Sequence, residues 1–161
     1  MRRDADASAE PPDAGAGASP EPAAVEGEAT GPVLWSDKPL SFWGGYDQNT
    51  GEIIDRRHPL AGHVGANRII AIPHTKGSST TTGVLLEAVR RGKSPAAIIT
   101  TGVASFLALA SIVANELYDT NFPVLMVAED DFNKLESADW LSISHDGVIE
   151  IGVNPQPDSP S

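Results

Sequence analysis

The sequence has 161 residues, a formal net charge of −11 and no cysteine. The acidic balance argues against nucleic-acid binding through a basic face. The lack of thiols excludes a disulfide framework, a cysteine nucleophile, and thiolate ligands for zinc or an iron–sulfur cluster within this chain. The longest strongly apolar stretch, residues 103–114, is too short to span a bilayer.

Residues 1–33 form a segment of low hydrophobicity. Its large apolar residues are limited to Met1, Val25 and Val33. Such a segment cannot bury enough surface to offset the entropy cost of ordering it, so we expect a disordered acidic tail rich in Ala, Pro and Gly. No apolar stretch follows the basic start of the chain, and the tail holds seven acidic residues. These features argue against targeting signals and favour a cytoplasmic protein. One domain is expected over residues 34–154, with a loose end at 155–161.

The body begins with segments that resemble short strands and turns. Residues 34–43 mix apolar and polar side chains and predict one or two strands. Asn49-Thr50-Gly51 is typical of a hairpin turn. Of the aromatic residues in this part, Trp35, Phe42 and Trp43 are expected in the core, with an exposed docking patch as the alternative.

The centre of the chain alternates short apolar runs with helical patterns. Strands are predicted at 68–72, 95–100 and 123–127, and helices at 84–91 and 103–118. This order predicts parallel strands joined by helical crossovers. The second helix is apolar nearly all round, which predicts that it is buried.

The C-terminal part changes character. The acidic residues 129–131 predict the start of a short helix. The runs 141–144 and 148–151, separated by a His-Asp-Gly turn, predict a hairpin. The sequence therefore predicts an α/β fold, with a βαβαβ centre and β-rich ends.

The most informative segment runs from Pro73 to Gly83 and contains five consecutive hydroxyl side chains at 78–82. It lies where the strand at 68–72 is expected to lead into the helix at 84–91. A helix N-terminus presents free N–H groups and the positive end of a dipole. From the residues alone two interpretations stay open: the hydroxyls cap the helix, or the junction binds an anion or a substrate.

Other ligand-binding motifs do not fit. Lys76 precedes Gly77-Ser78, whereas a Walker loop needs its lysine directly before the Ser or Thr. No GxGxxG fingerprint follows a strand, and no GxSxG elbow occurs. The four histidines match no metal-ligand spacing, so no metal site is predicted. His74 flanks the hydroxyl run and is a candidate substrate contact.

Four motifs then stand out by their order and spacing. They are Leu40-Ser41-Phe42-Trp43-Gly44-Gly45, Thr50-Gly51-Glu52-Ile53-Ile54-Asp55, His58-Pro59-Leu60, and Gly77-Ser78-Ser79 with Gly83-Val84-Leu85-Leu86-Glu87. Together they resemble the aconitase X small subunit, the swivel-domain protein of the aconitase superfamily. The resemblance covers residues from about Leu34 to Ile151.

The resemblance implies a swivelling β/β/α domain that docks on a larger subunit. The two subunits together would form a lyase that dehydrates a hydroxy acid. It also implies that an iron–sulfur cluster or iron is held by the large subunit, which agrees with the absence of cysteine here. No cofactor is expected on this chain itself.

The resemblance also implies roles for individual residues. Ser78, the first serine of the Gly-Ser-Ser loop, would be the base that removes the proton next to the carboxylate. Gly77, through its backbone, and Ser79 would contact an anion. Lys76 would either stabilise the serine alkoxide or meet the substrate carboxylate. Residues 101–105 are expected near this site, at the C-terminal edge of the sheet.

Members of the family act on more than one substrate. The bacterial type implies dehydration of cis-3-hydroxy-L-proline to 1-pyrroline-2-carboxylate, which the motif details favour. The archaeal type implies 5-phosphomevalonate. A third alternative, from a different class of function, is a non-catalytic swivel module that binds an anion.

Overall fold

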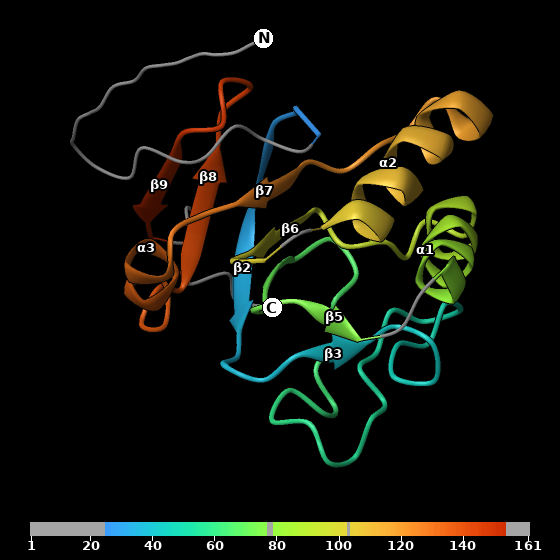
Figure 1. The fold of residues 1–161 in the computed structure, drawn as a ribbon, viewed down its shortest axis with the longest axis horizontal. Coiled ribbons are helices and arrows are strands. Elements are labelled where there is room, and N and C mark those ends of the chain that lie inside the picture. The colour runs from blue at the N-terminus through green and yellow to red at the C-terminus, as the bar shows by residue number, and fades with distance from the viewer. Residues whose placement is uncertain (1–24, 77–78, 103, 154–161) are drawn as a thin grey trace, which may run out of the picture.

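The centre of the chain folds as the sequence predicts (Figure 1). Strands β4 (Ile69–Ala71), β6 (Ala97–Thr100) and β7 (Val124–Met126) pair in parallel. Helices α1 (Ser79–Arg90) and α2 (Ser105–Tyr118) connect them. The three strands are buried on both faces, which explains why their sequences are continuous apolar runs.

The computed structural model describes residues 25–76, 79–102 and 104–153. Strand β2 (Ala29–Trp35) joins the parallel strands to the predicted C-terminal hairpin. It pairs in parallel with β4 and antiparallel with β8 (Trp140–Ile143). Strand β9 (Ile149–Gly152) completes one six-stranded sheet of order β7-β6-β4-β2-β8-β9.

The position of β2 changes the expected boundary of the tail. Residues 25–33 were expected in the disordered segment, but they belong to the folded body, and Val25 forms a bridge with Val124. Strand β2 does not depend on large apolar side chains, because β4 and β8 pair with its backbone on both sides. A Cβ added to the buried Gly31 would lie 3.2 Å from the carbonyl oxygen of Asn67, a tight contact that glycine avoids. The low hydrophobicity of this segment is therefore the reason why a central strand of the sheet is not predicted from the sequence.

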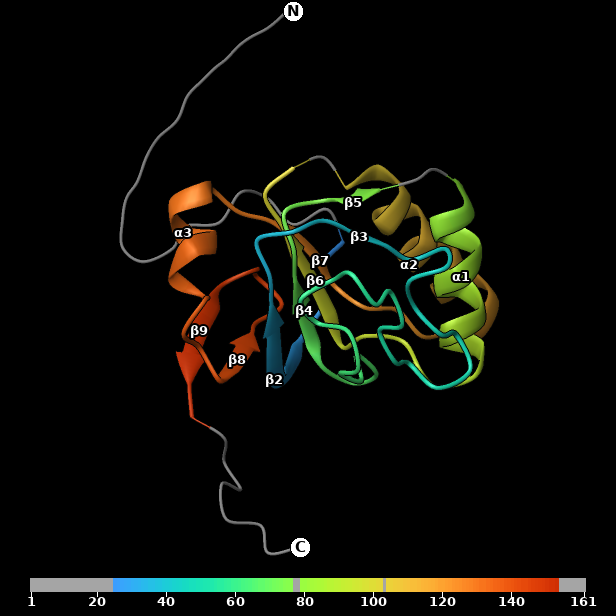
Figure 2. The ribbon, with the colours of Figure 1, turned by 90° about the horizontal axis from the view of Figure 1, so that it is seen from below.

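The sheet separates two cores. Ile70 and Ile98 face the core beneath α1 and α2, whereas Ile69 and Ile99 face the core beneath α3 (Glu129–Lys134). Figure 2 shows α1 and α2 on one side of the sheet and α3 on the other. Helix α3 begins with the three acidic residues that predicted it. None of the described helices is both long and apolar enough to cross a membrane.

Helix α1 starts earlier than the sequence predicts. Its first residue is Ser79 and not Val84, so the threonines at 80–82 are helical. Thr81 is fully buried, and packing overrides the weak helix propensity of threonine. Before the helix, β5 (Thr75–Lys76) pairs in parallel with β3 (Leu40–Ser41) as a separate ribbon.

Helix α2 is not buried all round, so that prediction is wrong. Its inner side, which includes Leu107 and Ala110, packs beneath the sheet, but its outer side is exposed. The outer face of α2 is defined here by Phe106, Leu109, Ile112 and Leu117, which are 39%, 45%, 52% and 62% exposed. Within the described residues, several large apolar side chains of α2 are therefore left exposed.

The three aromatic residues of the first segment behave differently. Phe42 is fully buried, and the partly buried Trp35 packs on Phe132 with ring centroids 5.3 Å apart. Trp43 is 65% exposed, so the expectation of a core position is wrong for this residue. The predicted turn at 49–51 is present, with Gly51 at a φ of +82°.

The buried hydroxyl of Ser111 connects α2 to the segment before β7. It donates to the carbonyl of Phe122 at 2.6 Å and accepts from the Phe122 N–H at 3.1 Å. We expect Ser111→Ala to lower the free energy of unfolding by about 1–3 kcal/mol, because both Phe122 groups lose this partner in a buried site. Urea denaturation measures the change. The exposed Thr120→Ala is the control, and equal effects of the two substitutions would contradict the prediction.

Tyr46 provides a pH-dependent contribution to stability. Its ring is buried against Phe42, and its hydroxyl donates to the carbonyl of Lys93 at 2.6 Å. Burial raises the pKa of Tyr46 well above its ordinary value. Above a pH of about 10 the unfolded chain therefore loses a proton that the folded chain keeps, and stability falls as the pH rises.

We expect Tyr46→Phe to remove this part of the alkaline loss and to cost about 1 kcal/mol at neutral pH for the missing hydrogen bond. Urea titrations of both proteins between pH 7 and pH 11 test this. An alkaline slope that is the same in both proteins would show that Tyr46 does not cause it.

Candidate functional site

Two segments meet at the C-terminal edge of strands β4 and β6. The N–H groups of Thr101 and Gly102 both donate to the carbonyl of Pro73, at 3.1 and 3.2 Å. The hydroxyl of Thr82, near the start of α1, donates to the carbonyl of Phe106 at 3.2 Å, in the first turn of α2. The starts of both helices therefore lie at one edge of the sheet, and Thr101 and Gly102 lie at this C-terminal edge as expected.

The starts of α1 and α2 are the part of this edge that suits an anion. The first turns of these two helices contain no acidic residue, whereas α3, which follows the parallel neighbour β7, begins with three. The N-cap residue of α2, Ala104, makes no side-chain hydrogen bond to the helix. The positive ends of two helix dipoles therefore lie at the same edge.

Three of the five predicted site residues, His74, Lys76 and Ser79, lie within the described part of the chain. His74 is exposed, and a Cβ added to Gly102 would lie 3.7 Å from the Cβ of His74. Lys76 is exposed on β5, and Ser79 is the first residue of α1. The predicted base, Ser78, and its neighbour Gly77 lie outside the described residues.

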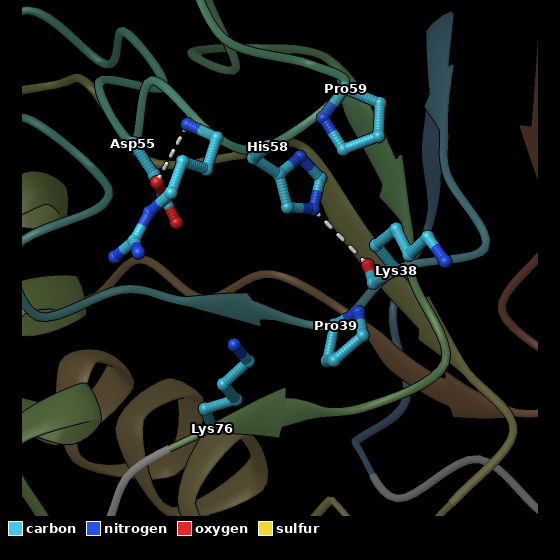
Figure 3. A pocket seen from close by; sticks show the side chains of 7 residues that line it. Lys38, Pro39, Asp55, His58, Pro59 and Lys76 are labelled. Carbon is cyan, nitrogen blue, oxygen red and sulfur yellow. Dashed lines mark hydrogen bonds between the residues drawn. The ribbon is translucent and has the colours of Figure 1, made fainter.

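Lys76 also lines a cavity of about 410 Å³ beside the β3–β5 ribbon (Figure 3). Its lining combines cationic, acidic and apolar groups. The lining residues are Lys38, Pro39, Asp55, Arg57, His58, Pro59 and Lys76. Among the described residues, no ion pair involves the three cationic side chains of this lining.

The side chain of His58 joins two segments that line this cavity. The ring is buried, with 6% exposure, and its Nε2 lies 3.1 Å from the carbonyl oxygen of Lys38. The N–H of Leu60 donates to Nδ1 at 3.1 Å. A carbonyl oxygen can only accept, so Nε2 carries the proton and the ring is neutral in this arrangement. Both ring nitrogens are engaged, and His58 therefore fixes two loops to one another.

Most of this cavity was not predicted from the sequence. The position of Arg57 next to the His-Pro-Leu motif could have indicated a role for this residue. Nothing in the sequence indicates that Lys38 lines the same cavity. No group of three or more potential metal ligands occurs within residues 25–76, 79–102 and 104–153. The described part of the site therefore offers cations and helix N-termini as its binding groups.

Comparison with known proteins places this arrangement in a family. The family model for the aconitase X swivel domain matches residues 21–151. The crystal structure of aconitase X from Thermococcus kodakaraensis, in its holo form, has a TM-score of 0.72 and 30% sequence identity. The match covers 82% of this chain and 95% of that chain.

Relatives of two kinds are similar in sequence. Cis-3-hydroxy-L-proline dehydratase from Hypocrea jecorina is 38% identical over 84% of this chain, and that from Pseudomonas aeruginosa is 40% identical over 83%. This chain spans only 23% of the length of each of those two proteins. The phosphomevalonate dehydratase small subunit of Thermococcus onnurineus is 34% identical, and the match covers 79% of this chain and 92% of that protein.

The family model covers most of the chain, and the small-subunit relative is matched over nearly its whole length. The shared fold agrees with both. This chain therefore belongs to the aconitase X swivel-domain family.

Proposed function

We propose that this chain is the small-subunit component of a hydro-lyase that dehydrates a small hydroxy acid. The observation that carries the proposal is that both groups of relatives are named dehydratases, although their substrates differ. The reaction class is therefore common to the relatives while the substrate is not. The edge formed by two helix N-termini and Lys76 supports the binding of an acidic substrate.

Cis-3-hydroxy-L-proline is the proposed substrate. The two dehydratases named for it are 38% and 40% identical to this chain, against 34% for the small subunit from Thermococcus onnurineus. The second candidate is 5-phosphomevalonate. It is favoured by the 92% coverage of that small subunit, compared with 23% of the hydroxyproline dehydratases.

Ser78 is the proposed proton acceptor. Removing the proton next to the carboxylate leaves an electron pair that forms the carbon–carbon double bond, and the hydroxyl on the neighbouring carbon leaves as hydroxide. The hydroxide and the proton accepted by Ser78 together make the one water lost in the dehydration. A serine hydroxyl needs help to act as a base. Lys76 lies two residues before Ser78 and α1 begins directly after it, so a cation and a helix N-terminus are available to stabilise the alkoxide.

A larger partner subunit is part of this proposal. With no cysteine, this chain supplies no thiolate ligand, so an iron–sulfur centre would be held by the partner. Such a centre supplies Lewis-acid chemistry for the departure of the hydroxyl. The chain's own contribution is to bind the acid group and to accept the proton.

The outer face of α2 is the proposed contact surface for that partner. It starts at Phe106, whose carbonyl accepts the Thr82 hydroxyl, so it adjoins the edge that carries the candidate site. A partner that completes the site must approach this edge. Exposed apolar side chains next to it would be buried on assembly, as is usual for the core of a protein interface.

We expect Ser78→Ala to lower kcat by at least about 100-fold, the usual contribution of a general base. The measurement is dehydration of cis-3-hydroxy-L-proline and of 5-phosphomevalonate by this chain co-expressed with its larger partner. Ser144→Ala, at an exposed position in the β8–β9 turn, is the matched control. Turnover that survives in Ser78→Ala would remove Ser78 from the mechanism. A folded complex without turnover of either substrate would favour the non-catalytic module.

We expect Leu109→Asp and Ile112→Asp each to weaken assembly with the larger partner by about tenfold or more, because a carboxylate would be buried in an apolar interface. Both side chains are exposed in the free chain, so folding should change little. Asn115→Asp adds the same charge at another exposed position of α2. Equal binding by all three variants in a pull-down titration would exclude this face as the interface.

A further inference from the structure

We propose that the cavity lined by Lys38, Arg57 and Lys76 is a subsite for an oxyanion, the carboxylate or phosphate monoester group of the ligand. This inference rests on the proposed function only for the identity of the ligand. The binding chemistry follows from the cavity itself.

The first support is the local charge. The lining holds three cations and one carboxylate, a formal surplus of two positive charges, in a chain whose net charge is −11. His58 adds no charge, because its hydrogen bonds require the neutral ring. Cations gathered at one cavity in an acidic protein favour an anionic ligand over a cationic one.

The second support is that these cations are not engaged elsewhere in the described structure. On α1, by contrast, Arg90 and Arg91 both pair with Glu87, four or fewer residues away. Lys38, Arg57 and Lys76 come from three separate parts of the chain and make no ion pair with a described residue. Local pairing along a helix does not explain why the fold brings them together.

The third support is that the backbone around the cavity is held in place. Strands β3 and β5 pair with Ser41 opposite Lys76, and Pro39 leads into this ribbon. His58 joins the Lys38 carbonyl to the loop that carries Arg57. Figure 3 shows Lys38 and Lys76 on neighbouring segments below His58. The flexible lysine side chains can follow an anion, and the planar guanidinium of Arg57 can bind two oxygens at once.

Asp55 allows the two ligand types to be distinguished. Its Oδ1 accepts the backbone N–H of Arg57 at 3.0 Å, so the carboxylate lies at the same loop. A cyclic amino acid carries an ammonium close to its carboxylate, and Asp55 is the acidic partner for that group within the lining. A phosphate monoester has no such group, and the negative charge of Asp55 opposes it.

The test is an NMR titration of the full chain with inorganic phosphate and, separately, with cis-3-hydroxy-L-proline. We expect Arg57→Gln to weaken binding of the preferred probe by about tenfold or more, the value of one hydrogen bond to a charged group. Arg56→Gln is the matched control, because Arg56 is the neighbouring residue but lines a different cavity. Asp55→Asn should weaken binding of the amino acid and strengthen binding of phosphate.

The subsite is overturned if the chain binds neither probe, or if Arg57→Gln binds as tightly as Arg56→Gln. In the assembled enzyme, Arg57→Gln should raise KM with little change in kcat, because it removes binding and leaves the base intact. Binding that depends on Arg57 without turnover of either substrate would keep the subsite and reject the proposed function. Turnover that depends on Ser78, with neither KM nor binding changed in Arg57→Gln, would keep the proposed function and reject the subsite.

Discussion

The carbonyl of Pro73 is the acceptor on which the candidate site depends. Three donors reach it, the N–H groups of Thr101 and Gly102 and the hydroxyl of Thr101. These bonds hold the chain leaving β4 against the chain leaving β6, so α1 and α2 begin side by side. Parallel strands bring their C-terminal ends to one edge in any such sheet, but the convergence at Pro73 joins the two loops there. His74 and the ribbon that carries Lys76 continue the chain directly after Pro73.

The sequence predicts the fold well where burial is complete. Strands β4, β6 and β7 are buried on both faces, and an apolar run is the only pattern such strands allow. Strand β2 escapes because it is central in the sheet but only partly buried along its length, with small residues such as Gly31 at the close contacts. Its place depends on pairing with β4 and β8, which are distant in sequence. The composition of a segment indicates whether its side chains are buried, but it does not indicate which strands the segment pairs with.

The same distinction governs the site. The hydroxyl run and Lys76 can be found from the sequence, because they lie on one continuous segment between a strand and a helix. The cavity cannot, because it is assembled from residues 38, 57 and 76 through a ribbon of two-residue strands and one buried histidine. Helix α2 shows a related limit. Its all-round apolar character indicates that both faces avoid water, but the sequence does not tell which face is covered by its own chain.

Two features of the surface then have one explanation. A domain that worked alone would gain stability by placing polar residues on the outer face of α2 and by pairing the cations of the cavity with its many acidic residues. In the described structure Phe106, Leu109, Ile112 and Leu117 remain exposed on α2, and no described carboxylate forms an ion pair with the cations of the cavity. Exposed apolar surface and unpaired charge both lower the stability of a free protein. Both strengthen binding when a partner or a ligand covers them. Both features agree with the proposed function, in which this domain contributes one wall of a site that it shares with a larger subunit.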